Sequence, residues 1–149
     1  MPCNEHRGHY RIATLASRLD TLLSRFVMRK MKQAGIEDIV AAHGDVLAVL
    51  FARSECTMSE IARASGRTRA TVTVLVDKLE HKGYVVRRSN ALDARSSLVS
   101  LTDKGESLRQ VFEEISRAMD EELLAALGRE GADALEAHLA RALELLPAS

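Results

Sequence analysis

Residues 57–82 read TMSEIARASGRTRATVTVLVDKLEHK, and this stretch predicts two short helices joined by a tight turn. Thr57 and Glu60 have the spacing of a capping box, in which a hydroxyl and a carboxylate bind the backbone amides at the start of a helix. Gly66 favours the left-handed backbone conformation that ends a helix. A second helix is then predicted from Thr68 or Arg69 to Lys82.

The dimensions of this helix pair are those of a helix-turn-helix, which presents its second helix to the major groove of DNA. Ala62 is small where the two helices would cross, and Val72 belongs to the apolar face that packs the second helix onto the first. The outward-facing residues of the turn and the second helix offer guanidinium, ammonium, hydroxyl and methyl groups, which reach the phosphates and base edges of DNA. These groups lie at Arg67, Thr68, Arg69, Ala70, Thr71, Thr73 and Lys78. An ordinary helical corner with a solvated basic face is the alternative.

A β-hairpin is predicted directly after the second helix. Residues 84–88 and 97–101 contain β-branched residues in partial alternation, and the polar segment 89–96 between them contains turn formers. Three arginines on this ribbon suit contact along phosphates or with an adjacent minor groove. They are Arg87, Arg88 and Arg95. Together, helix pair and hairpin indicate a winged helix-turn-helix.

Long helices are predicted on both sides of this unit, because the only prolines are Pro2 and Pro147. Apolar residues recur at helical spacing over residues 9–34 and 40–53, from Thr102 to a break at Gly128, and again beyond it. The first and the last two stripes are longer than a two-turn neighbour can cover. We therefore expect a homodimer rather than a monomeric bundle.

The predicted fold class is mainly α, with a small β-hairpin wing. In this arrangement residues 1–36 and 106–149 form dimerisation helices, and residues 37–105 form a winged helix-turn-helix lobe that binds DNA.

Charge is segregated along the chain although the net charge is zero. Residues 57–105 contain nine Lys or Arg and five Asp or Glu, whereas residues 106–149 contain four and ten. A basic segment beside an acidic one is typical of an anion-binding surface on a solubilising or partner-binding frame. Chance segregation in a small protein is the alternative.

Several locations and protein classes are disfavoured. The longest apolar run, residues 46–52, is too short to span a bilayer, and residues 1–11 lack the apolar stretch of a signal peptide, so we expect no membrane association and a cytoplasmic location. Two cysteines do not form a disulfide framework. The sequence also lacks phosphate-binding, dinucleotide-binding, zinc-protease and nucleophile-elbow motifs, so we expect no enzyme and no cofactor.

Two remaining alternatives concern charged and aromatic residues. Asp77 and Glu80 are paired carboxylates, but beside Lys78 and His81 they indicate a solvated helix face rather than acid-base catalysis. The scattered aromatic residues make no stacking platform for single-stranded nucleic acid. A winged-helix protein-interaction or dimerisation module without specific DNA binding is the competing function.

The sequence resembles the MarR family of bacterial transcription regulators over nearly its whole length. Five motifs, in this order and spacing, carry the resemblance: Met58-Ser59-Glu60-Ile61-Ala62, residues 71–80 (TVTVLVDKLE), Gly83-Tyr84-Val85, Asp93-Ala94-Arg95-Ser96 and Leu101-Thr102-Asp103-Lys104-Gly105. The resemblance implies an obligate homodimer whose terminal helices interlock and whose two lobes bind a pseudo-palindromic operator in double-stranded DNA, usually as a repressor.

The resemblance also implies roles for wing residues. Arg95 would lie beside the minor groove, with Asp93 orienting it and Ser96 next to it. The sequence departs from the family pattern at two positions. Ala94 stands where a proline is frequent in the family, which predicts a looser wing tip. Val74 stands where a basic residue is frequent on the recognition helix, which is the second helix of the helix-turn-helix. The second departure shifts the expected contacts to Arg69, Thr71 and Thr73.

Members of this family often release DNA when a small aromatic acid or similar effector enters a cleft between the dimerisation region and the DNA-binding lobe. Phe26, His43 and Leu47 are the candidates for that cleft, although such residues are more often part of a core. Cys3, His6 and His9 have a spacing that a metal could use, and Cys3 could instead sense oxidants. We predict neither role, and we expect Cys56 to be a small buried packing residue.

Overall fold

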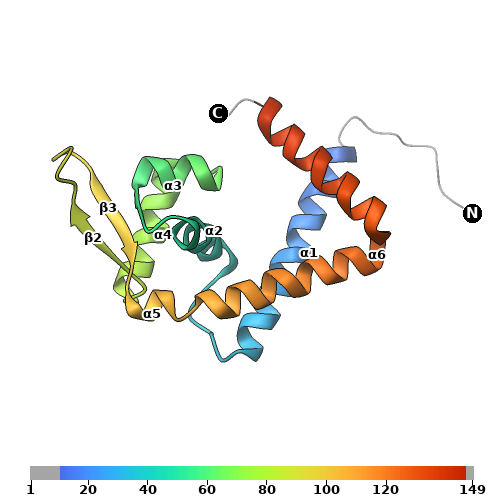
Figure 1. Cartoon of the computed structure of the whole chain (residues 1–149), viewed down its shortest axis with the longest axis horizontal. Helices are drawn as coiled ribbons and strands as arrows, with labels where there is room; N and C mark the ends of the chain where they lie inside the picture. Colours follow the sequence, from blue (N-terminus) through green and yellow to red (C-terminus); the bar gives the residue numbers. More distant parts are fainter. Residues whose placement is uncertain (1–10, 147–149) are drawn as a thin grey trace, which may run out of the picture.

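The computed structural model describes residues 11–146 and has two parts joined by one long helix (Figure 1). Helices α2, α3 and α4 and a small sheet form one part. Helix α1 and the carboxyl-terminal half of α6 form the other, and the first half of α6 connects them. The elements are α1 Arg11–Gln33, α2 Ala41–Ala52, β1 Glu55–Thr57, α3 Met58–Ser65, α4 Arg69–His81, β2 Val85–Ser89, β3 Ser97–Leu101, α5 Asp103–Glu106 and α6 Arg109–Leu145.

The helix-turn-helix forms as its sequence predicts. The Thr57 hydroxyl accepts a hydrogen bond from the Glu60 amide at 3.2 Å, and the Glu60 carboxylate accepts one from the Thr57 amide at 2.7 Å. Gly66 ends α3 with a φ of 64°, in the left-handed region. The inward face of α4 is buried, and Val72 is fully inaccessible to solvent. The mainly helical, winged fold class is confirmed.

The sheet has three antiparallel strands in the order β1-β3-β2, one more than the sequence predicted. The predicted hairpin is β2 and β3, with Val85 opposite Leu101. The additional strand β1 pairs with the other edge of β3 and places Cys56 opposite Val99. With three residues, β1 is too short for an alternating pattern, and its pairing depends on a strand about forty residues later in the chain.

Two glycines allow close packing around this lobe. A Cβ atom added to Gly44 would lie 3.3 Å from Cε1 of Phe112, so a glycine inside the continuous helix α2 leaves room for this ring. The Phe112 ring in turn lies 5.4 Å from the ring of Phe51. At Gly105 an added Cβ would lie 2.1 Å from the carbonyl oxygen of Tyr84. Both glycines therefore permit contacts between segments that are distant in sequence.

The helix predicted from Thr102 is divided into two. The Thr102 hydroxyl caps α5 by accepting a hydrogen bond from the Gly105 amide at 3.1 Å. The backbone then makes a tighter turn, in which the Leu108 amide donates to the carbonyl of Gly105, three residues earlier. Helix α6 begins at Arg109. The predicted break at Gly128 is present as a non-helical residue with a φ of 69° and a ψ of 168° inside α6. It turns the last helical segment away from the first (Figure 1).

No helix within residues 11–146 is both long and apolar enough to cross a membrane.

Candidate nucleic-acid interface

The outward face of α4 presents mainly polar side chains to solvent. Arg69, Ala70, Thr71, Thr73 and Lys78 are all exposed, as the sequence predicted. The Thr68 hydroxyl caps the helix by accepting a hydrogen bond from the Thr71 amide at 3.2 Å, and the two threonine hydroxyls lie 2.9 Å apart. The Thr73 hydroxyl donates to the Arg69 carbonyl at 2.9 Å. This surface therefore combines one guanidinium, one ammonium, threonine side chains and a methyl group.

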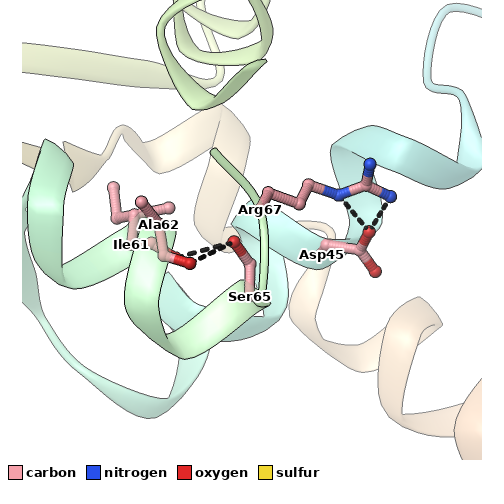
Figure 2. A network of polar contacts seen from close by, with 5 residues as sticks. All are labelled: Asp45, Ile61, Ala62, Ser65 and Arg67. Carbon is pink, nitrogen blue, oxygen red and sulfur yellow. Dashed lines mark hydrogen bonds and ion pairs between the residues drawn. The ribbon is translucent and has the colours of Figure 1, made fainter. Parts of the chain in front are cut away.

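Arg67 lies in the turn between α3 and α4, and its side chain points toward α2 (Figure 2). Its Nε donates to Oδ2 of Asp45 at 2.7 Å, and its Nη2 binds the same oxygen. Ser65 completes the turn by donating its hydroxyl to the carbonyl of Ile61 at 2.7 Å. Arg67 thus ties the turn to α2, whereas the sequence placed it with the DNA-contacting residues.

The tip of the wing is held by its own polar side chains. The Asn90 side chain accepts a hydrogen bond from the Leu92 amide at 3.0 Å and donates one to the Ser96 hydroxyl at 2.8 Å. Asp93 accepts a hydrogen bond from the backbone amide of Arg95 at 3.0 Å. Among the described side chains, Asp93 therefore contacts the backbone of Arg95 rather than its guanidinium. These bonds order the tip although Ala94 replaces a proline.

A polar cavity of about 310 Å³ lies between the wing and the starts of α3 and α4. Arg69 of α4 and Arg95 of the wing both line it, so two arginines that the sequence predicted separately meet at one place. Its full lining is Thr57, Met58, Ser59, Arg69, Asn90, Asp93, Arg95, Ser96 and Ser97. Ser59 and Asn90 were not predicted as site residues, and no sequence signal separates them from other surface polar residues.

Arg87 connects the wing to α4, the recognition helix. Its Nη2 binds Asp77, its Nη1 lies 3.6 Å from a carboxylate oxygen of Glu80, and its backbone amide donates to Glu80 at 3.1 Å. The sequence grouped Arg87 with the DNA-contacting arginines and assigned the two carboxylates to a solvated face. The structure instead pairs them, and only Arg88 of this arginine pair is exposed.

Comparisons with known proteins agree with this geometry. A model of the MarR family matches residues 35–96, which include the helix-turn-helix and most of the wing. Over these residues the chain is similar to the MarR family.

Individual proteins are similar to this chain over longer stretches. The HTH-type transcriptional repressor YetL of Bacillus subtilis is 31% identical over 105 residues, which are 65% of this chain and 63% of YetL. The chain thus spans less than two thirds of that relative. The S. aureus MepR structure, solved as a DNA complex, is 29% identical, has a TM-score of 0.78, and is matched over 90% of this chain and 97% of MepR. Reduced AbfR bound to DNA is 26% identical with a TM-score of 0.69 over 90% of each chain.

A second cavity, of about 560 Å³, lies among α1, α2 and α6. The predicted cleft residues Phe26, His43 and Leu47 do not line it. His43 and Leu47 are 2% and 0% exposed in the core, and Phe26 is half-buried with Arg29 and Lys30 over its ring. Its lining is Asp20, Leu23, Ser24, Val27, Ala41, Gly44, Asp45, Ala48, Phe51, Ala52, Arg109, Phe112, Glu113, Ile115, Ser116 and Met119.

The buried His43 is held in its neutral form. Its Nδ1 accepts a hydrogen bond from the Val40 amide at 3.1 Å, and its buried Nε2 has no hydrogen-bond partner among the described residues. Burial lowers the pKa of His43, the nearby Lys82 and Lys78 lower it further, and Asp38 opposes them. Protonation would place a charge in the core and remove the acceptor at the start of α2.

Acidification should therefore destabilise the protein through His43. The unfolded chain takes up this proton as the pH falls through about 6.5, while the folded chain, with its lower pKa, does not. Stability is thus retained above that pH and lost as the pH falls below it. Urea unfolding at pH 7 and pH 5 should show a smaller loss for His43→Gln than for the wild type. The exposed His138→Gln is the control, and equal losses in all three proteins would contradict this role.

The remaining predictions concern cysteine and metal. Cys56 is fully buried in the core, and burial raises the pKa of its thiol, as expected of a packing residue. Cys3, His6 and His9 lie outside the described residues. Within residues 11–146, no three or more His, Cys, Asp or Glu side chains are grouped so that they could hold a metal ion.

Proposed function

We propose that the protein is a homodimeric, DNA-binding transcription regulator, and that it acts as a ligand-responsive repressor at a pseudo-palindromic operator. The observation that carries the proposal is the convergence of Arg69 and Arg95 on one cavity between the recognition helix and the wing. Two guanidinium groups on neighbouring elements suit a DNA backbone, because most protein contacts to DNA are made to phosphate oxygens. The DNA complexes of MepR and AbfR and the name of YetL support it.

The proposed DNA surface consists of the outward face of α4 and the wing. Side chains of α4 would read the major groove, and the wing would contact the minor groove or the phosphates. The members of this surface are Thr68, Arg69, Ala70, Thr71, Thr73, Lys78, Arg88, Asp93, Arg95 and Ser96. Arg67 and Arg87 would shape this surface through their carboxylate partners.

The proposed dimer uses the apolar faces of α1 and α6. Large apolar side chains of these two helices remain exposed in the single chain, which is costly in water. They are Ile12, Leu15, Leu22, Leu127, Leu139, Leu143, Leu145 and Leu146, with exposed fractions from 46% to 85%. Residues 1–36 and 106–149 would accordingly form the dimerisation region, and residues 37–105 the DNA-binding lobe.

Fluorescence anisotropy with duplex DNA from upstream of the protein's own gene tests the function. A specific regulator should bind this DNA about a thousandfold more tightly than unrelated competitor, with an affinity that falls steeply with salt. Arg69→Ala and Arg95→Ala should each weaken binding about tenfold and make the salt dependence shallower by about one phosphate contact.

The exposed Arg117→Ala of α6 is the matched control and should bind DNA like the wild type. If neither the upstream DNA nor the sites recovered from a genome-wide selection are bound specifically, the protein-binding alternative replaces the proposal. Unchanged affinity of Arg95→Ala at moderate salt would remove the wing from the DNA surface.

A further inference from the structure

The cavity among α1, α2 and α6, here called the interlobe cavity, has the size and wall of a small-molecule site. Its volume of about 560 Å³ lies within the usual range for ligand pockets. Phe51 and Phe112 contribute two rings 5.4 Å apart, and Leu23, Val27 and Met119 add aliphatic and thioether surface. An aromatic or otherwise apolar body therefore fits this wall.

The charges around the interlobe cavity are predominantly negative. Asp20, Asp45 and Glu113 line it, with Arg109 as the single cationic residue. The Arg109 guanidinium is already engaged, because its Nη2 donates to Glu106 at 3.0 Å and its Nη1 donates to the Phe51 carbonyl at 2.8 Å. Glu106 does not line the cavity but neutralises this arginine. Asp45 is likewise paired with Arg67, so the field that an arriving ligand meets comes mainly from Asp20 and Glu113.

We propose that the interlobe cavity binds an amphipathic organic cation, an aromatic or apolar body that carries an ammonium or amidinium group. The inference rests on the proposed function and names the chemical class of the effector. The cation would be attracted by the carboxylates and by the Phe112 ring, because the Arg109 guanidinium already lies over the Phe51 ring, 5.0 Å from its centroid. An aromatic acid, the ligand implied by the resemblance, would instead be repelled by the carboxylates of Asp20 and Glu113.

Asp45 links the interlobe cavity to the DNA-binding lobe. Its carboxylate lines the cavity and also binds Arg67 in the turn that precedes α4 (Figure 2). A cation placed beside Asp45 shares this carboxylate and repels the Arg67 guanidinium, so the ion pair weakens. Occupancy of the cavity thereby loosens the attachment of the turn to α2. The recognition helix begins two residues after Arg67 and depends on that turn for its position.

Two probes of the same shape and opposite charge test the ligand class. Isothermal titration calorimetry of the full-length protein without DNA compares 1-naphthylmethylammonium with 1-naphthoate at pH 7. The ammonium should bind at least about tenfold more tightly, equivalent to about 1.4 kcal/mol. Asp20→Asn and Glu113→Gln should each weaken its binding about threefold.

The matched control is Glu114→Gln, which removes a neighbouring exposed carboxylate of α6 that does not line the cavity and should leave binding unchanged. Equal or tighter binding of naphthoate overturns the proposal. So does ammonium binding that is indifferent to both cavity variants. Neither measurement involves DNA, so the ligand class can fail while specific DNA binding holds, and the reverse outcome is equally distinguishable.

Hydrogen exchange tests the link to the turn. The Arg67 amide is bonded to the Ala62 carbonyl at 3.1 Å, so its exchange reports on the attachment of this segment. The ammonium probe should accelerate exchange within residues 62–69 of the wild type. Arg67→Gln leaves the cavity wall intact but removes the ion pair, so its exchange should already be fast and should not respond to the probe. An equal response in both proteins would show that Asp45 and Arg67 do not transmit occupancy.

Discussion

Gly105→Ala is expected to lower the free energy of unfolding by about 3 kcal/mol or more, a large effect for one methyl group. The added Cβ would lie 2.1 Å from the Tyr84 carbonyl oxygen and 3.0 Å from a methyl group of Leu101. The carbonyl cannot retreat easily, because it accepts a hydrogen bond from the Thr102 amide at 3.1 Å. Thermal unfolding should show a decrease in Tm of about 10 °C for a chain of this length.

Gly66→Ala separates this clash from a general cost of replacing glycine. Gly66 has a φ of 64°, yet an added Cβ would meet nothing within 4 Å. Gly66→Ala should therefore lower the free energy of unfolding by only about 1 kcal/mol, the strain of an alanine in the left-handed conformation. Both variants are compared at one protein concentration, because the proposed dimerisation would contribute to Tm. Equal losses at the two positions would mean that the approach of Tyr84 does not explain the glycine.

The double substitution Leu139→Glu and Leu143→Glu is expected to convert the protein to monomers and to reduce operator affinity about a hundredfold or more. Both leucines lie on one face of α6, with exposed fractions of 47% and 80%, so the change costs the single chain little. In a dimer, however, buried glutamates would repel one another and lose hydration. A monomer also loses the gain from binding two half-sites at once. Sedimentation velocity gives the mass, and fluorescence anisotropy gives the affinity.

Ala134→Glu with Ala137→Glu is the matched control for charge. These residues are exposed on the opposite face of the same helix. The control should remain dimeric and bind the operator like the wild type. A monomeric control, or a leucine variant that stays dimeric, would place the dimer contact elsewhere than on this face of α6.

The parts of the fold that sequence predicts are those with local causes. The capping box at Thr57 spans four residues, the left-handed turn needs only Gly66, and the apolar face of α4 repeats within one helix. Each is decided by neighbours along the chain. Strand β1 is not, because its hydrogen bonds come from β3 much later in the sequence. The tight contact of Gly44 with Phe112 likewise depends on two distant helices.

The site was predictable by residue type but not by partner. Arg67, Arg87 and Arg95 look alike in sequence, and only their surroundings show that Asp45 engages the first and Asp77 the second. The lining of the cavity was likewise predicted only to within one residue. His43 and Leu47 were placed in the cleft, but the residues that follow them, at positions 44 and 48, line it. One residue along a helix turns the side chain by about 100°, which is finer than position alone resolves.

The attachment of Arg87 to α4 has a consequence for how such a protein would choose among DNA sites. Because Asp77 and Glu80 hold the base of the wing, the recognition helix and the wing keep a set spacing. A duplex whose local twist and groove width match that spacing is bound without distortion, whereas a stiffer or differently twisted duplex must be deformed first. Base pairs that no side chain touches would then contribute to selectivity through their mechanical properties.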